Sequence, residues 1–325
     1  MIRYEYTDHL PADFTAAGLR ADVLEGLLAT PKWLPPKWFY DKTGSALFEE
    51  ITQLPEYYPT RAERSILDRH AGEVVARAGA GQLVELGSGS SEKTRLLLDQ
   101  LPAAGSSYVA LDVSESALRM ACESVAAGYP GLKVAAVRAD FEHQLSTVLQ
   151  VEAGPGGRQV AFLGGSIGNF DPDQRRAFLA ELRAGLRPGD AFLLGADLVK
   201  AESVLVPAYD DAAGVTAAFN LNVLEVLNRR LAADFDRADF EHRAIWDPVN
   251  AWIEMRLRAI RPVRVRIAEL GLELDFAAGE ELRTEISAKF TAERLAAEFA
   301  AAGFAAAGWW TDAQDRFSLS LWRPA

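Results

Sequence analysis

A segment rich in glycine and serine, Glu85 to Thr94 (ELGSGSSEKT), has the composition of a loop that binds a ligand through its backbone. The apolar run QLVEL overlaps its start and a stretch with helical spacing follows it, so we expect a turn from a strand into a helix. Gly87 and Gly89 allow a tight turn and close approach by a ligand, and the helix N-terminus adds backbone donors. By itself, the pattern is equally typical of an ordinary strand-to-helix turn.

Acidic side chains follow at the ends of the next two predicted strands. Asp112 comes 25 residues after Gly87, at the end of YVALD, where a carboxylate can accept hydrogen bonds from both hydroxyls of a ribose. Asp140 and Phe141 end the strand after that, and could bind an adenine amino group and stack on its ring. Because the carboxyl ends of parallel strands meet at one edge of a sheet, these features together predict a nucleoside site.

The details of the turn indicate which nucleoside derivative would fit. A dinucleotide site requires a third glycine where this chain has Glu92, whose carboxylate would face a pyrophosphate. S-adenosylmethionine has no phosphate; its amino-acid tail carries an ammonium group, which could lie near Glu85, and a carboxylate, which Lys93 could bind. Taken alone, Lys93 is more typical of a solvated helix lysine. We therefore predict S-adenosylmethionine as the cofactor, with a nicotinamide-dependent oxidoreductase or a non-catalytic nucleoside-binding module as the alternatives.

These residues require a parallel sheet with crossover helices to position them. From about residue 62, short apolar runs alternate with amphipathic stretches, which indicates an α/β domain. A closing hairpin on a five-strand parallel sheet is more typical of methyltransferase cores than of dehydrogenases. Ser114 and Thr291 are good helix N-caps, and Gly303 would end the second of these helices. We expect a helix over 91–101, parallel strands over 82–86, 108–112, 132–137, 160–163 and 191–196, and a hairpin over 305–311 and 317–322.

The alternation stops after Lys200 and resumes at Thr291, which divides the chain into two domains. Between them, the alternating stretch 251–260 (AWIEMRLRAI) indicates a half-buried strand. The expected fold is a Rossmann-like class I methyltransferase core with a smaller inserted α+β substrate domain. We assign residues 62–199 and 290–325 to the core, and residues 8–61 and 200–289 to the substrate domain.

Length and composition exclude several classes of protein. The chain has 325 residues, which fits two domains, and a net charge of −12, which gives no basic field for nucleic acid or an anionic membrane. Its single cysteine, Cys122, and four scattered histidines provide neither a disulfide nor metal-ligand spacing. No signal peptide or membrane-spanning run is apparent. We expect a cytoplasmic monomer without a metal, nucleic-acid or membrane partner.

Several long and unusual segments closely resemble those of one family, the S-adenosylmethionine-dependent L-histidine Nα-methyltransferases of ergothioneine biosynthesis. The resemblance covers nearly the whole chain. The segments are PPKWFYD from Pro35, GSALF from Gly44, LPEYYPTR from Leu54, the ELGSGSSEKT turn, GGSIGNF from Gly164 and TEIS from Thr284.

The resemblance implies a role for particular residues. The cofactor would be held by residues matching Tyr40, Gly87, Lys93, Asp112, Asp140 and Phe141. The acceptor would be held by residues matching Tyr57, Asn169, Tyr209, Glu285 and Ser287, with Met255 lining the same pocket. Tyr40 or Tyr57, directly or through water, would orient the lone pair of the acceptor amine, and no histidine or lysine is an obvious base.

The residue types fit an amino-acid acceptor with a heteroaromatic ring. Glu285 and Ser287 are two apart on an expected extended segment, so they share a face and could bind both imidazole nitrogens. A buried carboxylate favours a ligand with N–H donors, because an unpaired buried charge is costly. Asn169 could donate to the acceptor carboxylate and accept from its amine, or it could merely cap the next helix, for which Asp171 is the better candidate.

The implied activity is three successive methylations of the α-amino group of L-histidine, giving Nα,Nα,Nα-trimethylhistidine (hercynine). This is the first step of ergothioneine biosynthesis. The nearest alternative is an N-methyltransferase of the same fold that acts on a tryptophan-derived indole amine, which we would expect to lack the acid at Glu285.

Overall fold

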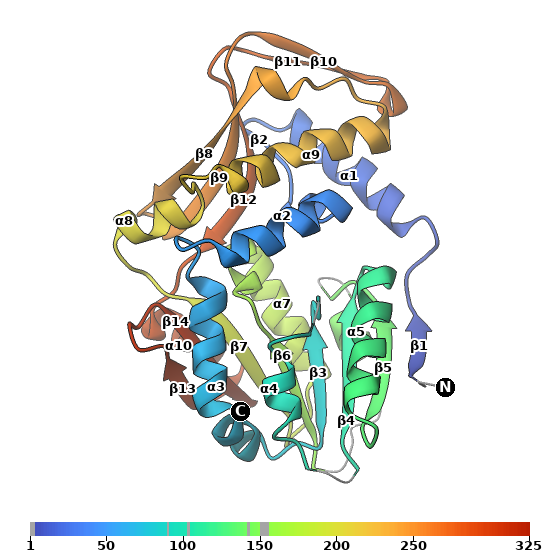
Figure 1. The fold of residues 1–325 in the computed structure, drawn as a ribbon, viewed down its shortest axis with the longest axis vertical. Helices are drawn as coiled ribbons and strands as arrows, with labels where there is room; N and C mark the ends of the chain where they lie inside the picture. Colours follow the sequence, from blue (N-terminus) through green and yellow to red (C-terminus); the bar gives the residue numbers. More distant parts are fainter. Residues whose placement is uncertain (1–3, 90, 103–104, 142–143, 150–155) are drawn as a thin grey trace. The chain divides into compact units, whose positions relative to one another are not determined.

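The computed structural model describes residues 4–89, 91–102, 105–141, 144–149 and 156–325 (Figure 1). Ser90 of the glycine-rich turn and His143 lie outside the described residues. The chain divides into two compact units, each made of separate segments. The first comprises Met1–Leu10, Pro59–Val199 and Phe290–Ala325, and the second comprises Pro11–Tyr58 and Lys200–Lys289.

The first unit is built on an eight-stranded sheet with the strand order β1-β5-β4-β3-β6-β7-β14-β13. Six of these strands run parallel; β14 is antiparallel to β7, and β13 is antiparallel to β14. The strands are β1 (Glu5–Asp8), β3 (Gln82–Leu86), β4 (Ser107–Asp112), β5 (Lys133–Arg138), β6 (Arg158–Phe162), β7 (Ala191–Asp197), β13 (Phe304–Thr311) and β14 (Phe317–Pro324).

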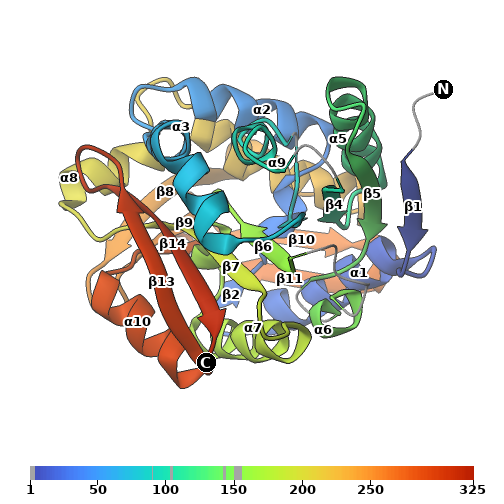
Figure 2. The same cartoon turned by 90° about the horizontal axis from the view of Figure 1, so that it is seen from below.

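Helices cover both faces of this sheet, with α3 and α5 on one face and α7 and α10 on the other (Figure 2). Strands β3, β6 and β7 are buried along their whole length, as expected for a parallel sheet covered on both faces. The helices are α3 (Pro59–Ala78), α4 (Arg95–Leu98), α5 (Glu115–Gly128), α6 (Leu145–Val148), the 3-10 helix η2 (Ser166–Asn169), α7 (Pro172–Gly185) and α10 (Ala292–Ala301).

The second unit contains a four-stranded sheet, with the order β2-β12-β9-β8, and a separate antiparallel pair, β10 and β11. Its strands are β2 (Lys32–Trp33), β8 (Phe240–Asp247), β9 (Trp252–Ala259), β10 (Val263–Ile267), β11 (Leu272–Phe276) and β12 (Glu281–Ala288). Its helices are α1 (Phe14–Leu28), α2 (Lys42–Gln53), α8 (Glu202–Leu205) and α9 (Val215–Leu231), with the 3-10 helices η1 (Pro36–Phe39), η3 (Val206–Ala208), η4 (Arg237–Asp239) and η5 (Ala268–Leu270).

The expected strands of the core are present, with ends shifted by a few residues, and the C-terminal hairpin is antiparallel. Ser114 and Thr291 cap their helices through side-chain oxygens. The helix expected over 91–101 is wrong. Ser91 has a positive φ of 54°, so the chain is still turning there, and the α-helix is confined to Arg95–Leu98.

The N-terminal segment also departs from the expected division. Residues 8–10 and 59–61 belong to the first unit rather than the second. Strand β1 adds a sixth parallel strand beside β5, and α3 begins at Pro59. The sequence EYTD of β1 is mostly exposed and lacks the alternating apolar pattern that would predict a strand.

The insertion leaves and rejoins the first unit at adjacent backbone positions. The Val199 amide donates to the Phe290 carbonyl at 2.9 Å, and Leu198 forms a parallel bridge with Phe290. Within the described part of the chain, no helix combines the length and apolar character needed to cross a bilayer.

Candidate functional site

The glycine-rich turn of the first unit follows β3 and is fixed to the end of the neighbouring strand. Gly87 and Gly89 have positive φ angles of 66° and 48°, which explains why glycine is needed there. The Gly87 amide donates to the Leu111 carbonyl at 2.8 Å, directly before Asp112. A Cβ on Gly87 would lie 3.8 Å from the ring of Phe141, so the turn and this ring are close neighbours.

The buried carboxylate of Glu85 stabilises the turn through hydrogen bonds. Tyr108 donates to the Glu85 carboxylate at 2.5 Å, Thr94 donates to its other oxygen, and Ser91 lies 2.8 Å from the Tyr108 hydroxyl. Burial raises the pKa of Glu85 to about 7, although these hydrogen bonds and Lys93 act in the opposite direction. Glu85, which we expected near the cofactor ammonium, thus holds the start of the turn to Thr94, the residue directly before the short helix α4.

Asp112, Asp140 and Phe141 lie at the carboxyl ends of β4 and β5, beside the turn after β3. The backbone amide of Ser114 donates to Asp112 at 2.9 Å, while burial raises the pKa of the Asp112 carboxyl. Phe141 packs edge-on against Phe162, with ring centroids 5.4 Å apart. The structure therefore brings together the three strand ends on which the predicted nucleoside site depends.

Lys93, the expected partner of the cofactor carboxylate, forms an ion pair with Glu63 of α3. Glu63 is fully buried and also accepts the backbone amide of Gly164, at 2.8 and 3.0 Å, at the end of β6. An ammonium group has three donors, so Lys93 retains donors for a second acceptor. Sequence reasoning missed Glu63, which joins the glycine-rich turn to the GGSIGNF loop.

One signal for this buried acid was present in the sequence. Gly195 interrupts the apolar strand AFLLGAD, and a glycine inside a strand often marks a close approach. A Cβ on Gly195 would lie 2.0 Å from a carboxylate oxygen of Glu63. Gly195 therefore provides the space that the Glu63 side chain occupies.

Asn169 ends the 3-10 helix η2, which follows β6 in the first unit. It is not the cap of the next helix, because Asp171 accepts from the amides of Asp173 and Gln174 and forms a capping box with Gln174. The ordinary structural role considered for Asn169 is thus filled by Asp171.

The remaining predicted residues lie in the second unit, where four aromatic rings form a continuous row. Tyr40 packs against Phe48, Phe48 against Tyr57, and Tyr57 against Tyr209, with centroid separations of 5.6, 6.1 and 6.4 Å. Tyr40, predicted to bind the cofactor, is therefore in a different unit from the other five cofactor candidates.

The segment that carries Tyr40 is held by its neighbour, Asp41. Its carboxylate caps α2 by accepting the Gly44 amide at 2.7 Å, and it also accepts from Asn222 of α9 at 2.8 Å. A Cβ on Gly44 would lie 1.8 Å from the carbonyl oxygen of Phe39, so only glycine fits at this position. These contacts fix the backbone on both sides of Tyr40.

The pKa of Tyr40 is raised above its ordinary value. Desolvation is the largest cause, followed by the negative charge of Glu285 and by Tyr209. Because 52 % of Tyr40 is exposed, solvent reduces the size of this pKa shift. The negative charge of Glu285 raises the pKa as well, so the direction of the shift is unchanged. The Tyr40 hydroxyl therefore stays protonated at neutral pH.

Glu285, Ser287 and Met255 share one face of the β8-β9-β12 sheet. Glu285 is paired with Met255, and Ser287 with Ile253, and paired residues on antiparallel strands point to the same side. The sequence-based expectation that Glu285 and Ser287 share a face is thus confirmed by the register. Ser287 and Met255 are buried, whereas Glu285 is half-buried.

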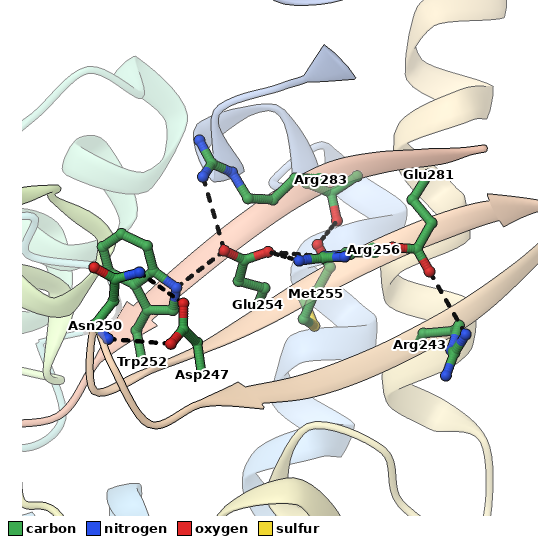
Figure 3. Close-up of polar contacts among 10 residues, drawn as sticks. Arg243, Asp247, Asn250, Trp252, Glu254, Met255, Arg256, Glu281 and Arg283 are labelled. Carbon is green, nitrogen blue, oxygen red and sulfur yellow. Dashed lines mark hydrogen bonds and ion pairs between the residues drawn. The ribbon is translucent and has the colours of Figure 1, made fainter. Parts of the chain in front are cut away.

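The opposite face of this sheet carries a charged network (Figure 3). Glu254 accepts from the Trp252 indole at 3.0 Å and from Arg256 at 2.7 Å, and Arg256 also pairs with Glu281. Figure 3 shows the side chains of Glu254 and Arg256 on one side of the strands and the Met255 sulfur on the other. The sheet therefore separates a charged face from the face that carries Glu285.

A buried lysine that sequence reasoning missed completes the cluster around Tyr209. The ammonium of Lys289 donates to the hydroxyls of Tyr209 and Ser287, both at 2.8 Å, and these two hydroxyls are themselves 2.8 Å apart. Lys289 has no exposed surface. The sequence signal for this lysine was its position two residues after Ser287 and four after Glu285, which places it on the same face of an extended segment.

A parallel sheet closed by an antiparallel hairpin, with a glycine turn and acids at consecutive strand ends, defines a class I S-adenosylmethionine-dependent methyltransferase core. In fold, the chain is similar to the PH0226 protein from Pyrococcus horikoshii OT3, with a TM-score of 0.50 and 14% identity over 88% of this chain and 100% of that one. At this identity the likeness shows the fold alone.

Sequence comparisons identify the family. Residues 19–324 match the family described as histidine-specific methyltransferase, SAM-dependent, and the chain belongs to this family. It is 54% identical to the histidine N-alpha-methyltransferase of Mycolicibacterium smegmatis, over 97% of each chain, and 50% identical to that of Mycobacterium tuberculosis, over 98% of this chain and 99% of the relative. It is also 32% identical to ergothioneine biosynthesis protein 1 of Schizosaccharomyces pombe, over 66% of this chain and 29% of that protein.

Membership in this family decides between the classes of function left open by the sequence. The protein is an S-adenosylmethionine-dependent N-methyltransferase, and a nicotinamide-dependent oxidoreductase is excluded.

Proposed function

We propose that the protein transfers three methyl groups in succession to the α-amino group of L-histidine, giving Nα,Nα,Nα-trimethylhistidine, and that this reaction begins ergothioneine biosynthesis. The names of the two mycobacterial relatives and of the fission-yeast relative support the acceptor and the pathway. The observation that carries the proposal is the shared face of Glu285 and Ser287 beside Tyr209 and Lys289.

The chemistry of the donor set fits S-adenosylmethionine, which when bound supplies an electrophilic methyl group on a sulfonium. We propose that Asp112 accepts from the ribose hydroxyls and that Phe141 packs on the adenine beside Asp140. The backbone of Gly87 allows close approach, and Lys93 binds the carboxylate of the amino-acid tail. The contact between Tyr40 and the cofactor stays a prediction.

The acceptor would be held mainly by charged and hydroxyl groups of the second unit. We propose that Glu285 and Ser287 bind the imidazole nitrogens, that Tyr209 donates to the carboxylate, and that Met255 fills the space beside the ring. Asn169 keeps its predicted role as a donor to the carboxylate. Holding the amine in line with the methyl group contributes most of the rate, because no covalent intermediate is needed.

The aromatic row suits a product that carries a permanent positive charge. Faces of tyrosine and phenylalanine rings attract quaternary ammonium groups. Tyr40 or Tyr57, directly or through water, would orient the amine in the first steps, and the rings of both would tolerate the trimethylammonium group at the end. The amine must lose a proton before each transfer, and the protonated Tyr40 hydroxyl can orient it without accepting that proton.

Mass spectrometry tests the proposed reaction directly. Incubation of the protein with histidine and excess S-adenosylmethionine should yield a product heavier than histidine by three methyl groups, with tryptophan competing poorly. A product limited to one methyl group, or a preference for tryptophan, would contradict the proposal.

The role of Glu285 has its own test. Glu285→Ala should lower kcat/KM for histidine by about a hundredfold or more, because a charged hydrogen-bonding partner is removed, while binding of S-adenosylhomocysteine should change by less than twofold. Glu281→Ala is the matched control, because Glu281 is on the same strand but pairs with Arg256 on the opposite, charged face. Equal loss of cofactor-product binding and histidine turnover in Glu285→Ala would oppose the assignment.

A further inference from the structure

The strand that carries Glu285 contains an irregularity directly before it. Arg283 pairs with Arg256 and Glu285 pairs with Met255, so Thr284 is an extra residue in β12, a β-bulge. Arg283 and Glu285 are two residues apart, yet Arg283 shares a face with Arg256 and Glu285 shares the opposite face with Met255. The direction in which Glu285 points therefore depends on how the chain bends at Thr284.

A buried amide holds this bulge in place. The Thr284 hydroxyl lies 2.6 Å from the amide oxygen of Asn220, to which it donates, and 3.0 Å from the carbonyl oxygen of Met255. The amide nitrogen of Asn220 donates to Nδ1 of His242 at 2.8 Å and to the Arg256 carbonyl at 3.1 Å. Asn220 has no exposed surface and Thr284 is 1% exposed, so water does not replace these bonds.

The same network reaches the backbone of Tyr209. Nε2 of His242 lies 2.8 Å from the Tyr209 carbonyl, which can only accept, so His242 carries its proton on Nε2 and accepts from Asn220 on Nδ1. Tyr209 is thus held at its carbonyl by His242 and at its hydroxyl by Lys289 and Ser287.

We propose that Asn220, Thr284 and His242 are positioning residues for the acceptor, because one buried amide fixes both the bulge that aims Glu285 and the backbone of Tyr209. The network acts through the backbone that carries Glu285 and Tyr209. This inference rests on the proposed function of Glu285 and Tyr209 in holding histidine.

Thr284→Val tests the inference, because valine has a similar volume but lacks the hydroxyl and leaves the Asn220 oxygen without its donor. By calorimetry in the presence of S-adenosylhomocysteine, histidine affinity should fall about tenfold or more, while affinity for S-adenosylhomocysteine alone stays within twofold. Kinetics should show a rise in KM for histidine and a smaller preference for histidine over tryptophan. Thr284→Ser, which keeps the hydroxyl, should have the histidine affinity and the preference for histidine of the wild type.

Thr52→Val is the matched control for a general loss of stability. Thr52 is a nearly buried threonine of α2 in the same unit, and its hydroxyl donates to the Glu49 carbonyl at 2.7 Å. It should alter the melting temperature without changing histidine affinity. If Thr284→Val and Thr52→Val lower the melting temperature alike and both bind histidine as the wild type does, the inference is wrong.

A second variant applies if Thr284→Val does not fold. Asn220→Asp replaces the donor to His242 with an acceptor, which favours a doubly protonated ring, close to Asp210 and Asp211 on one side and the new carboxylate on the other. The pH profile of histidine binding should shift relative to the wild type, and an unchanged profile would overturn the proposal. If the wild type itself does not bind histidine, the proposed function fails; if it does and these variants match it, the inference alone fails.

Discussion

At the scale of single residues, the face of the sheet that carries Glu285 and Ser287 combines one half-buried carboxylate with one fully buried ammonium group. Glu285 is half-buried, whereas Lys289 has no exposed surface and donates to the hydroxyls of Tyr209 and Ser287. Both hydroxyl oxygens accept from the ammonium, so a buried positive charge lies directly beside Tyr209. The arrangement favours an anionic group, such as the carboxylate of an amino acid, next to Tyr209.

Lys289→Met should therefore weaken histidine binding by about tenfold to a hundredfold, the range expected when a charge-assisted hydrogen-bond network is lost. Binding of S-adenosylhomocysteine should be unchanged. Calorimetry of both ligands checks this. Lys200→Met is the control, because Lys200 also donates to a tyrosine hydroxyl, that of Tyr58, at 2.7 Å. Histidine binding that is weakened equally in both variants would argue against a specific role for Lys289.

At the scale of elements, the sequence predicted those strands and turns that depend on local periodicity. The strand 82–86 was predicted at its observed limits because its apolar run is bounded by clear turn residues, and the gathering of Gly87, Asp112, Asp140 and Phe141 followed from strand order. What depends on long-range packing was missed. The polar strand β1 forms only because β5 offers it an edge, and Glu63 is buried only because Gly195, far along the chain, leaves room for it.

The bulge at Thr284 shows the same limit within one strand. Strict alternation would place Arg283 and Glu285 on one face, whereas the register places them on opposite faces. The prediction that Glu285 and Ser287 share a face held because both follow the bulge. A lone threonine gives no local signal for an extra residue, since its partner, Asn220, is on a helix 64 residues earlier.

The turn after β3 yields a prediction about pH. Burial raises the pKa of Glu85 to about 7 from an ordinary value of 4.5, so the folded chain binds this proton more tightly than the unfolded chain does. The contribution of Glu85 to stability is therefore greatest below pH 4.5 and is lost as the pH rises toward 7. The loss should be on the order of 3 kcal/mol.

Urea denaturation of the cofactor-free protein at several pH values measures this effect. The free energy of unfolding of the wild type, relative to Glu85→Gln, should fall as the pH rises from about 4.5 to about 7. Glu92→Gln is the control, since Glu92 is an exposed acid of the same turn. If the difference in the free energy of unfolding between the wild type and Glu85→Gln stays constant over this range, Glu85 ionises normally.

At the scale of the whole molecule, the proposed ligand contacts are divided between two compact units. Five of the six cofactor candidates are in the first unit, whereas Tyr57, Tyr209, Met255, Glu285 and Ser287 are in the second. Each unit has its own sheet and buried side chains. A ligand that contacts one unit should therefore stabilise that unit first.

Hydrogen exchange can resolve this order. S-adenosylhomocysteine alone should slow exchange at the amides around Gly87, Asp112 and Phe141, and histidine added afterwards should slow exchange in β12 and around Tyr209. Mass spectrometry of peptides from the intact protein would measure both steps. Protection of β12 by S-adenosylhomocysteine alone, to the level reached with both ligands, would contradict this separation.

The neighbouring backbone positions at which the insertion begins and ends have a consequence for how such enzymes diversify. Val199 and Phe290 are joined by a hydrogen bond, so the framework already holds the two ends of the 90 intervening residues, Lys200–Lys289, together. Replacing that stretch with one of different length or composition would leave the core's strand order intact. Such a replacement would change the segment that carries Tyr209, Glu285 and Ser287 while keeping the strands and turns of the first unit.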